Sequence, residues 1–271
     1  MDDRITRRRF LAGSAVTATA SVSGCTVAGS ERDVTETVTN TYDLDGASRL
    51  TVSVSIGEVQ VQQADRESVR VRGTKAAAGE SDLESLELVS ERTDDTLELR
   101  VENEESVFRL GPQPKMDLDI VVPEGVDTLG LDVTSDGVTV DGVDAEIAVD
   151  GTNGDISLTD VDAATVDTTN GDVTVDGADG DVRADLTNGD VELRGVTGDI
   201  DVETTNGEID IYTEAELDAT VEFETTNGDI RVETAEGVQR SEGSYSGTFG
   251  DGSRRISAGS TNGDITLSVG S

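Results

Sequence analysis

The sequence predicts an all-β chain folded as a β-solenoid of the parallel β-helix type, with about 18 residues per coil. The first observation behind this prediction is an internal repeat, Asn-Gly-[Asp/Glu]-[Ile/Val], which recurs at intervals of 17, 18, 18, 21 and 35 residues. Its first residues are Asn153, Asn170, Asn188, Asn206, Asn227 and Asn262. A fixed period of this length is typical of architectures in which identical turns stack along one edge.

The second observation is a half-period of nine residues. Within the repeats, glycines nine residues apart are each followed by an acidic residue and then Val or Ile; they are Gly171, Gly180, Gly189, Gly198 and Gly207. Apolar and polar residues alternate after each glycine, as in Val173 and Val175, which is the pattern of a half-buried strand. Each coil is therefore expected to hold two turns and two short strands.

Asn-Gly between alternating strands is also a strong hairpin signal, which would give an antiparallel β meander, sandwich or barrel. The full Thr-Asn-Gly-Asp signature recurs at 18 residues rather than nine, and this favours the solenoid. Gly137 and Gly263 are seven periods apart. Seven coils at roughly 4.8 Å each predict a stack about 34 Å long.

The repeats define a β-repeat domain at residues 44–271, with irregular repeats at 44–130 and regular ones at 131–271. In the irregular part, Ile56-Gly57-Glu58-Val59 is a divergent turn. Residues 76–90 fit either a single helix or a further loop and strand. The Gly-rich segment 237–259 predicts a loop or an edge hairpin that interrupts the last coils.

The N-terminus differs from everything that follows. A basic stretch precedes a short small-residue apolar run, and residues 1–24 are interpreted as a twin-arginine-type lipoprotein signal peptide with Arg7, Arg8, Phe10 and Leu11 in its export motif. Val22-Ser23-Gly24-Cys25 is similar to a lipobox, so Cys25 is the expected lipidation site. Residues 25–43 are then a tether rich in Thr, Ser and Glu.

These N-terminal features predict an exported protein held at the outer face of the cytoplasmic membrane, that is, at the cell surface. A lipid group with two chains anchors a protein stably, whereas a single chain does not. The membrane, reached through this lipid, is therefore the first expected partner.

The composition excludes several functions. The chain has no His and one Cys, so it lacks a Ser-His-Asp triad, a Cys-His nucleophile and a Cys/His zinc site. The formal charge is -38, which excludes nucleic acid as a partner. Acidic excess with only two Lys resembles proteins of salt-loving archaea, in which monovalent cations screen the charge. No cofactor is implied.

The repeated turn residues have an expected structural role. Gly accepts positive φ, and stacked Asn amides can hydrogen-bond along an edge. The acidic residue after each Gly would form a column of like charges, so the cation candidates are Asp155, Asp172, Asp190, Glu208 and Asp229. The turns lack the Gly-Gly-x-Gly-x-Asp pattern of calcium β-rolls, and we assign no metal site.

The export signal and the Thr-Asn-Gly-Asp-[Ile/Val] repeats resemble the uncharacterised β-strand repeat family labelled "putative adhesin", in its haloarchaeal-type, twin-arginine-exported lipoprotein form. The resemblance covers residues 44–271 and carries no catalytic residues. It implies a non-enzymatic protein for surface adhesion, envelope structure or binding of a surface protein or glycan. The alternatives are a carbohydrate-active β-helix enzyme and a calcium-dependent surface scaffold. Tyr245 and Phe249 fit either a ligand site or packing over the end of the core.

Overall fold

The structure is a computed structural model that describes residues 32–103 and 112–270. Arg7, Arg8, Phe10, Leu11 and Cys25 lie outside the described residues, so their predicted roles stay predictions. The elements are β1 (Val34–Asp43), β2 (Arg49–Ile56), β3 (Val59–Gln63), β4 (Ser68–Ala77), α1 (Glu80–Glu84), β5 (Leu86–Thr93), β6 (Thr96–Asn103), β7 (Lys115–Val122), β8 (Thr128–Ser135), β9 (Val138–Asn153), β10 (Ile156–Asn170), β11 (Val173–Ala178), β12 (Val182–Asn188), β13 (Val191–Val196), β14 (Ile200–Asn206), β15 (Ile209–Thr213), β16 (Ala219–Thr234), β17 (Gly237–Phe249), β18 (Arg254–Asn262) and β19 (Ile265–Val269).

The regular repeats form a parallel stack, which confirms the solenoid. In β12 the side chains of Val182, Ala184 and Leu186 are buried while the residues between them face outward. The next coil lies directly above in register, with Val182 opposite Ile200 and Asn188 opposite Asn206. The antiparallel alternative is therefore wrong for these repeats.

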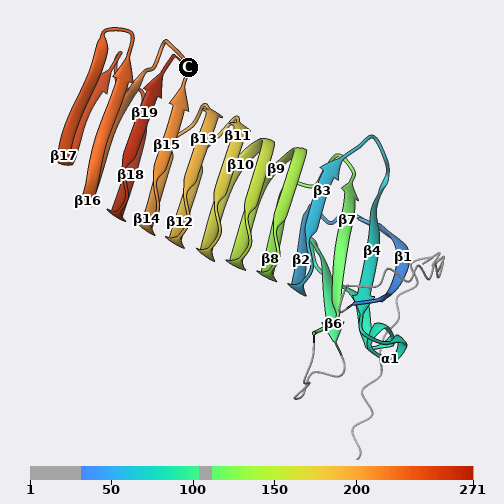
Figure 1. Ribbon diagram of the computed structural model, residues 1–271. Helices are drawn as coiled ribbons and strands as arrows, with labels where there is room; N and C mark the ends of the chain where they lie inside the picture. Colours follow the sequence, from blue (N-terminus) through green and yellow to red (C-terminus); the bar gives the residue numbers. More distant parts are fainter. Residues whose placement is uncertain (1–31, 104–111, 271) are drawn as a thin grey trace, which may run out of the picture.

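Two layers of strands enclose the core (Figure 1). In one layer the order is β6–β2–β8–β9–β10–β12–β14–β18–β16. In the other it is β7–β3–β9–β10–β11–β13–β15–β19–β16. The long strands β9, β10 and β16 bend and contribute to both layers. The interior is a column of Val, Ile, Leu and Ala side chains, as the small β-branched composition predicts.

The stack order departs from the chain order at the C-terminal end. Strands β18 and β19 lie between the coil of β14 and β15 and the later strand β16. The 35-residue interval between Asn227 and Asn262 is therefore not two periods, because β16 and β17 form the edge hairpin expected at 237–259. Six steps instead of seven separate the first and last turns, so this part is about 29 Å long.

Two side chains fix this reversed order. The Asp218 carboxylate accepts hydrogen bonds from the amides of Gly252 and Ser253 at 2.6 and 3.1 Å, which holds the turn between β17 and β18. Arg254 donates to the carbonyl oxygens of Val196 and Gly198 at 2.6 and 2.9 Å. The incoming strand β18 is thereby attached to the coil beneath it.

The N-terminal end also reverses its order and ends in antiparallel strands. The coil of β6 and β7 lies outside the earlier coil of β2 and β3, and the antiparallel strands β5, β4 and β1 continue beyond it. The expected tether at 25–43 needs correction, because Val34–Asp43 is strand β1 and pairs with β4. Its Thr residues alternate with Val34, Glu36, Val38, Asn40 and Tyr42, of which Tyr42 is buried in the core.

The segment 76–90 contains both elements that its sequence allowed. A five-residue helix, α1, precedes strand β5, and only Leu83 of the helix is buried. Among the described residues no helix has the length and apolar character needed to span a membrane.

Candidate functional site

The six repeated Asn side chains form one continuous column along an edge of the stack. Every Nδ2 except that of Asn153, which begins the column, donates to the Oδ1 of the Asn one coil below, at 2.8 to 3.0 Å. All six Nδ2 groups also donate to a Thr backbone carbonyl of the coil below, at 3.2 to 3.4 Å; for Asn153 this Thr is Thr134. The order in the column is Asn153, Asn170, Asn188, Asn206, Asn262, Asn227, which follows the stack and not the chain.

The glycine after each Asn is required by close contact as well as by backbone conformation. Gly189 has a φ of +146°, and a Cβ at this position would lie 2.0 Å from the Gly171 carbonyl oxygen. Gly207 repeats the contact with the Gly189 carbonyl at 1.9 Å. Glycine is therefore retained in these turns because no larger residue fits between them.

The acidic column predicted as a cation site has internal partners. Three of the five candidates accept, through a carboxylate oxygen, the backbone amide of the acidic residue in the next coil: Asp155 from Asp172 at 3.1 Å, Asp172 from Asp190 at 2.9 Å and Asp190 from Glu208 at 2.8 Å. Asp264, which the sequence analysis did not single out, accepts from Asp229 at 2.8 Å. These charge-assisted hydrogen bonds offset part of the repulsion between the carboxylates.

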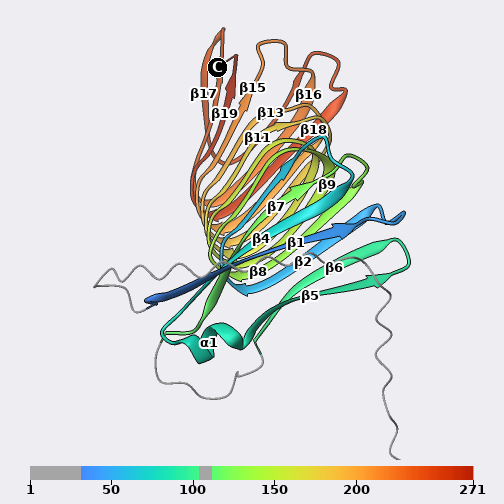
Figure 2. The same ribbon diagram turned by 90° about the vertical axis from the view of Figure 1, so that its right-hand side faces the viewer.

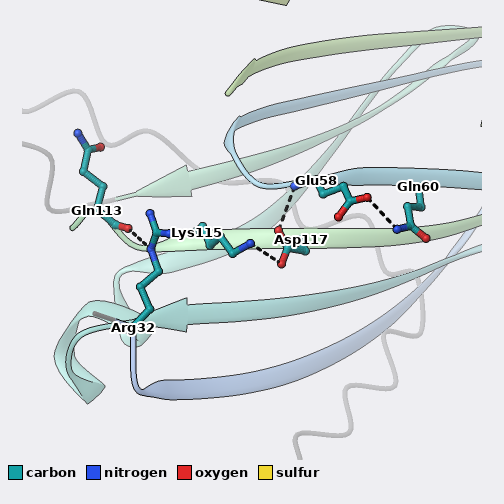
Figure 3. A network of polar contacts seen from close by, with 6 residues as sticks. All are labelled: Arg32, Glu58, Gln60, Gln113, Lys115 and Asp117. Atoms are coloured by element: carbon teal, nitrogen blue, oxygen red, sulfur yellow. Dashed lines mark hydrogen bonds and ion pairs between the residues drawn. The ribbon is translucent and has the colours of Figure 1, made fainter. Parts of the chain in front are cut away.

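The hydrogen bond between a carboxylate and a backbone amide of the neighbouring coil also occurs in the irregular part of the chain (Figure 3). Asp117 Oδ1 accepts the amide of Glu58 at 3.0 Å, and the Lys115 Nζ lies 3.0 Å from the second oxygen of Asp117. Glu58 Oε1 in turn accepts from the Gln60 side chain at 3.0 Å. The divergent turn at Gly57 thus keeps the carboxylate-to-amide bond of the regular repeats. No cluster of three or more Asp, Glu, His or Cys side chains suited to a metal ion occurs in residues 32–103 and 112–270.

An acidic groove runs beside the Asn column and is the main hollow on this edge. Its volume is about 780 Å³, and it extends from β9 across the stack to β17. One wall is a row of acidic side chains and the other a row of exposed threonines. The acidic groove is lined chiefly by Asp150, Asp167, Asp185, Glu203, Glu224, Thr169, Thr187, Thr205, Thr226 and Thr261.

The carboxylates of the acidic groove lie in register across the strands. Asp167 is opposite both Asp150 and Asp185. Although its side chain is exposed, partial desolvation raises the pKa of Asp167, the two flanking carboxylates raise it further, and Arg183 lowers it. Arg183 forms ion pairs of 2.7 Å with Asp185 and Asp201 and so neutralises part of this row.

Sequence reasoning missed the acidic groove, although a signal for it exists. An acidic residue stands three positions before five of the six Asn residues, and Gly259 takes this position before Asn262. Because three residues before the turn still belong to the strand, these side chains project outward beside the column. The repeated Thr directly before each Asn marks the opposite wall.

The aromatic residues near the C-terminus serve packing. Tyr245 lies 6.2 Å from Phe223, ring centre to ring centre, and both Tyr245 and Phe249 pack against the core from β17. This supports the expectation that the hairpin packs over the end of the core. Arg255 forms an ion pair of 2.6 Å with Glu222, as its acidic surroundings predict, whereas Arg254 binds backbone carbonyls instead.

Comparison with solved structures finds similar folds at low identity. A "putative cell adhesion protein" from Clostridium sporogenes is 11% identical with a TM-score of 0.43, covering 87% of this chain and 99% of its own. A "putative adhesin" from Bacteroides fragilis is 16% identical with a TM-score of 0.45, covering 86% and 96%. A third, from Parabacteroides distasonis, is 8% identical with a TM-score of 0.43, covering 85% and 96%.

A search among curated proteins found no match. The family model described as Toastrack DUF4097 matches residues 47–211 and 125–268, which together span both the irregular and the regular repeats. The chain belongs to the Toastrack DUF4097 family.

Proposed function

We propose that this chain is a non-catalytic, lipid-anchored cell-surface protein that presents a rigid acidic rod for adhesion, envelope structure or contact with a surface protein or glycan. The observation that carries the proposal is the acidic groove, which repeats the same carboxylate and threonine pattern on successive coils. A repeated polar surface on a rigid support suits multivalent contact with a hydroxyl-rich polymer or a cation-bearing surface. The N-terminal signal and Cys25 supply the expected route to the surface.

The turn residues support this assignment because their polar groups are used internally. The Asn amides bind each other and the Thr carbonyls, and the acidic column binds backbone amides. By contrast, the acidic groove directs its carboxylates and hydroxyls outward. Contact with a partner is therefore assigned to the acidic groove and not to the Asn column.

The anchor is tested by fractionating cells that express the full chain. Wild-type protein is expected with membranes and Cys25→Ser in the soluble exported fraction, while Thr26→Ser serves as the neighbouring control. If Cys25→Ser stays with membranes as the wild type does, the lipid anchor is wrong.

Adhesion is tested with cells that display the full chain on envelope-coated surfaces. The pair Asp167→Asn and Asp185→Asn should reduce attachment severalfold, because both carboxylates face the acidic groove. The matched control is the pair Asp176→Asn and Asp210→Asn, which removes the same charge at outward positions of β11 and β15 that do not line the acidic groove. Equal attachment of all variants would contradict a role for the acidic groove.

The carbohydrate-active alternative is tested on the same variants. Asp167 has a raised pKa and flanking carboxylates, which is the arrangement of an acid and base pair. Turnover of envelope polysaccharide by the full chain, abolished by Asp167→Asn, would replace the proposal with an enzymatic one.

A further inference from the structure

Strand β17 presents a free edge at one end of the stack. It has 13 residues and, among the described residues, pairs only with β16. Figures 1 and 2 show β17 at the end opposite β1 and β4. A free strand edge is a ready template for pairing with another strand.

The hydrogen-bond pattern of the repeats identifies which groups of this edge point outward. Inward-facing residues such as Val182 and Val173 donate their amides to the following coil, to Asp199 and Asp190. The equivalent residues of β16 are Ile230 and Val232, which therefore bond to their β17 partners, Ser241 and Gln239. The alternate residues of β17, namely Val238, Arg240 and Glu242, direct their backbone groups away from the stack.

The charges of this edge are poorly matched inside the chain. Arg240 lies opposite Arg231 of β16, and Glu242 lies opposite Asp229. Like charges directly opposite each other are destabilising in an antiparallel pair. Val238, 45% exposed, is also the one large hydrophobic residue counted as exposed in the described ranges.

We infer that β17 is a homophilic docking strand, which pairs antiparallel with β17 of a second copy of this chain about Ser241. This register places Arg240 of each copy opposite Glu242 of the other, so two pairs of opposite charge form across the interface, whereas within the chain each of these residues lies opposite a like charge. It also joins residues of equal orientation, because Arg240 and Glu242 both direct their backbone groups outward and form a hydrogen-bonded pair.

The position of β17 relative to the membrane decides which copies of the chain it can meet. This step rests on the proposed lipid anchor. Cys25 precedes the start of β1 by nine residues, which reach about 30 Å when fully extended. Eleven strand spacings, or about 53 Å, separate β1 from β17 in the second layer. The anchored chain therefore carries β17 at its far tip, where it meets copies on a facing surface.

The test is sedimentation of the full chain carrying Cys25→Ser, in molar KCl to screen the net charge. A reversible dimer is expected. Arg240→Glu should weaken it at least tenfold by placing Glu opposite Glu242, and the double exchange Arg240→Glu with Glu242→Arg should restore it to within about threefold. Arg183→Glu changes the net charge equally in the middle of the stack and should leave the dimer unchanged.

Val238→Pro provides a second test, because it removes an outward amide without changing a charge or a bond to β16. It should abolish the dimer while the circular dichroism spectrum stays that of the parent. A chain that is monomeric at all concentrations overturns the inference, as does a dimer that tolerates both Val238→Pro and Arg240→Glu. The outcome is independent of membrane fractionation, so failure here is distinct from failure of the lipid anchor.

Discussion

Substitution of one turn glycine tests the stacked-turn geometry most directly. In Gly189→Ala the new Cβ would lie 2.0 Å from the Gly171 carbonyl oxygen, so the two turns must separate by about 1.4 Å to reach the 3.4 Å of ordinary contact. That shift is too large for the bonds of Asn188 to Asn170 at 2.9 Å and of the Asp190 amide to Asp172 at 2.9 Å. Two lost hydrogen bonds at about 0.5–1.5 kcal/mol each, with backbone strain of about 1–3 kcal/mol, predict a loss of about 2–6 kcal/mol.

The assay is urea unfolding in molar KCl, with Gly142→Ala as the matched control. Gly142 also has positive φ, +59°, but no atom lies within 4 Å of a Cβ there. Gly142→Ala should therefore lower the free energy of unfolding only through the strain of a Cβ-bearing residue at positive φ, by about 1–2 kcal/mol. If the two variants unfold at the same urea concentration, close approach of the turns does not set the requirement for glycine.

Three further predictions concern single side chains. Asn188→Asp replaces both donated hydrogen bonds with oxygen-to-oxygen contacts and should cost about 1–2 kcal/mol in urea unfolding at pH 7, with partial recovery on acidification. The pKa of Asp167 is higher in the folded chain than in the unfolded chain, so between these two pKa values the folded chain keeps a proton that the unfolded chain has lost. The free energy of unfolding therefore falls as pH rises through this range. Asp167→Asn should stabilise the fold by a few tenths of a kcal/mol at pH 7 and by nothing at pH values below this range. Arg254→Met removes the donors to two carbonyls of the coil beneath and should lower the free energy of unfolding by about 1–3 kcal/mol. It should also raise the rate of amide exchange across residues 219–249. Arg255→Met breaks only an exposed ion pair and should lower the free energy of unfolding by less than about 1 kcal/mol.

The regular coils could be predicted from sequence because their determinants are local and repeated. Asn170 and Gly171 specify a turn, and Val173 and Val175 specify a strand whose partner is the same pattern 18 residues later. Because neighbouring coils carry the same sequence pattern, the register of their strands is unambiguous. Any other offset would remove every Asn pair and every glycine contact at once.

The ends of the stack could not be predicted in this way. The insertion of β18 beneath β16 depends on Asp218 and Arg254, which act on backbone groups 34 to 58 residues away and belong to no repeat. The sequence of β1 indicates a tether and not a strand because its partner, β4, is antiparallel and lies outside the period. Both cases depend on contacts between unlike segments, for which a single sequence carries no internal copy to compare.

The acidic groove and the Asn column differ in how strictly their positions are kept, and this difference separates structure from function within one repeat. The six Asn-Gly turns of the regular stack keep both residues, because the Asn side chains bond to one another and each Gly lies against the carbonyl of the neighbouring turn. Three residues earlier the repeat varies among Asp, Glu and the glycine at 259. Stacking does not depend on that side chain, since Gly259 pairs with Glu203 and Glu224 in normal register. The acidic side chains of the acidic groove are therefore free to be selected for what they contact outside the chain.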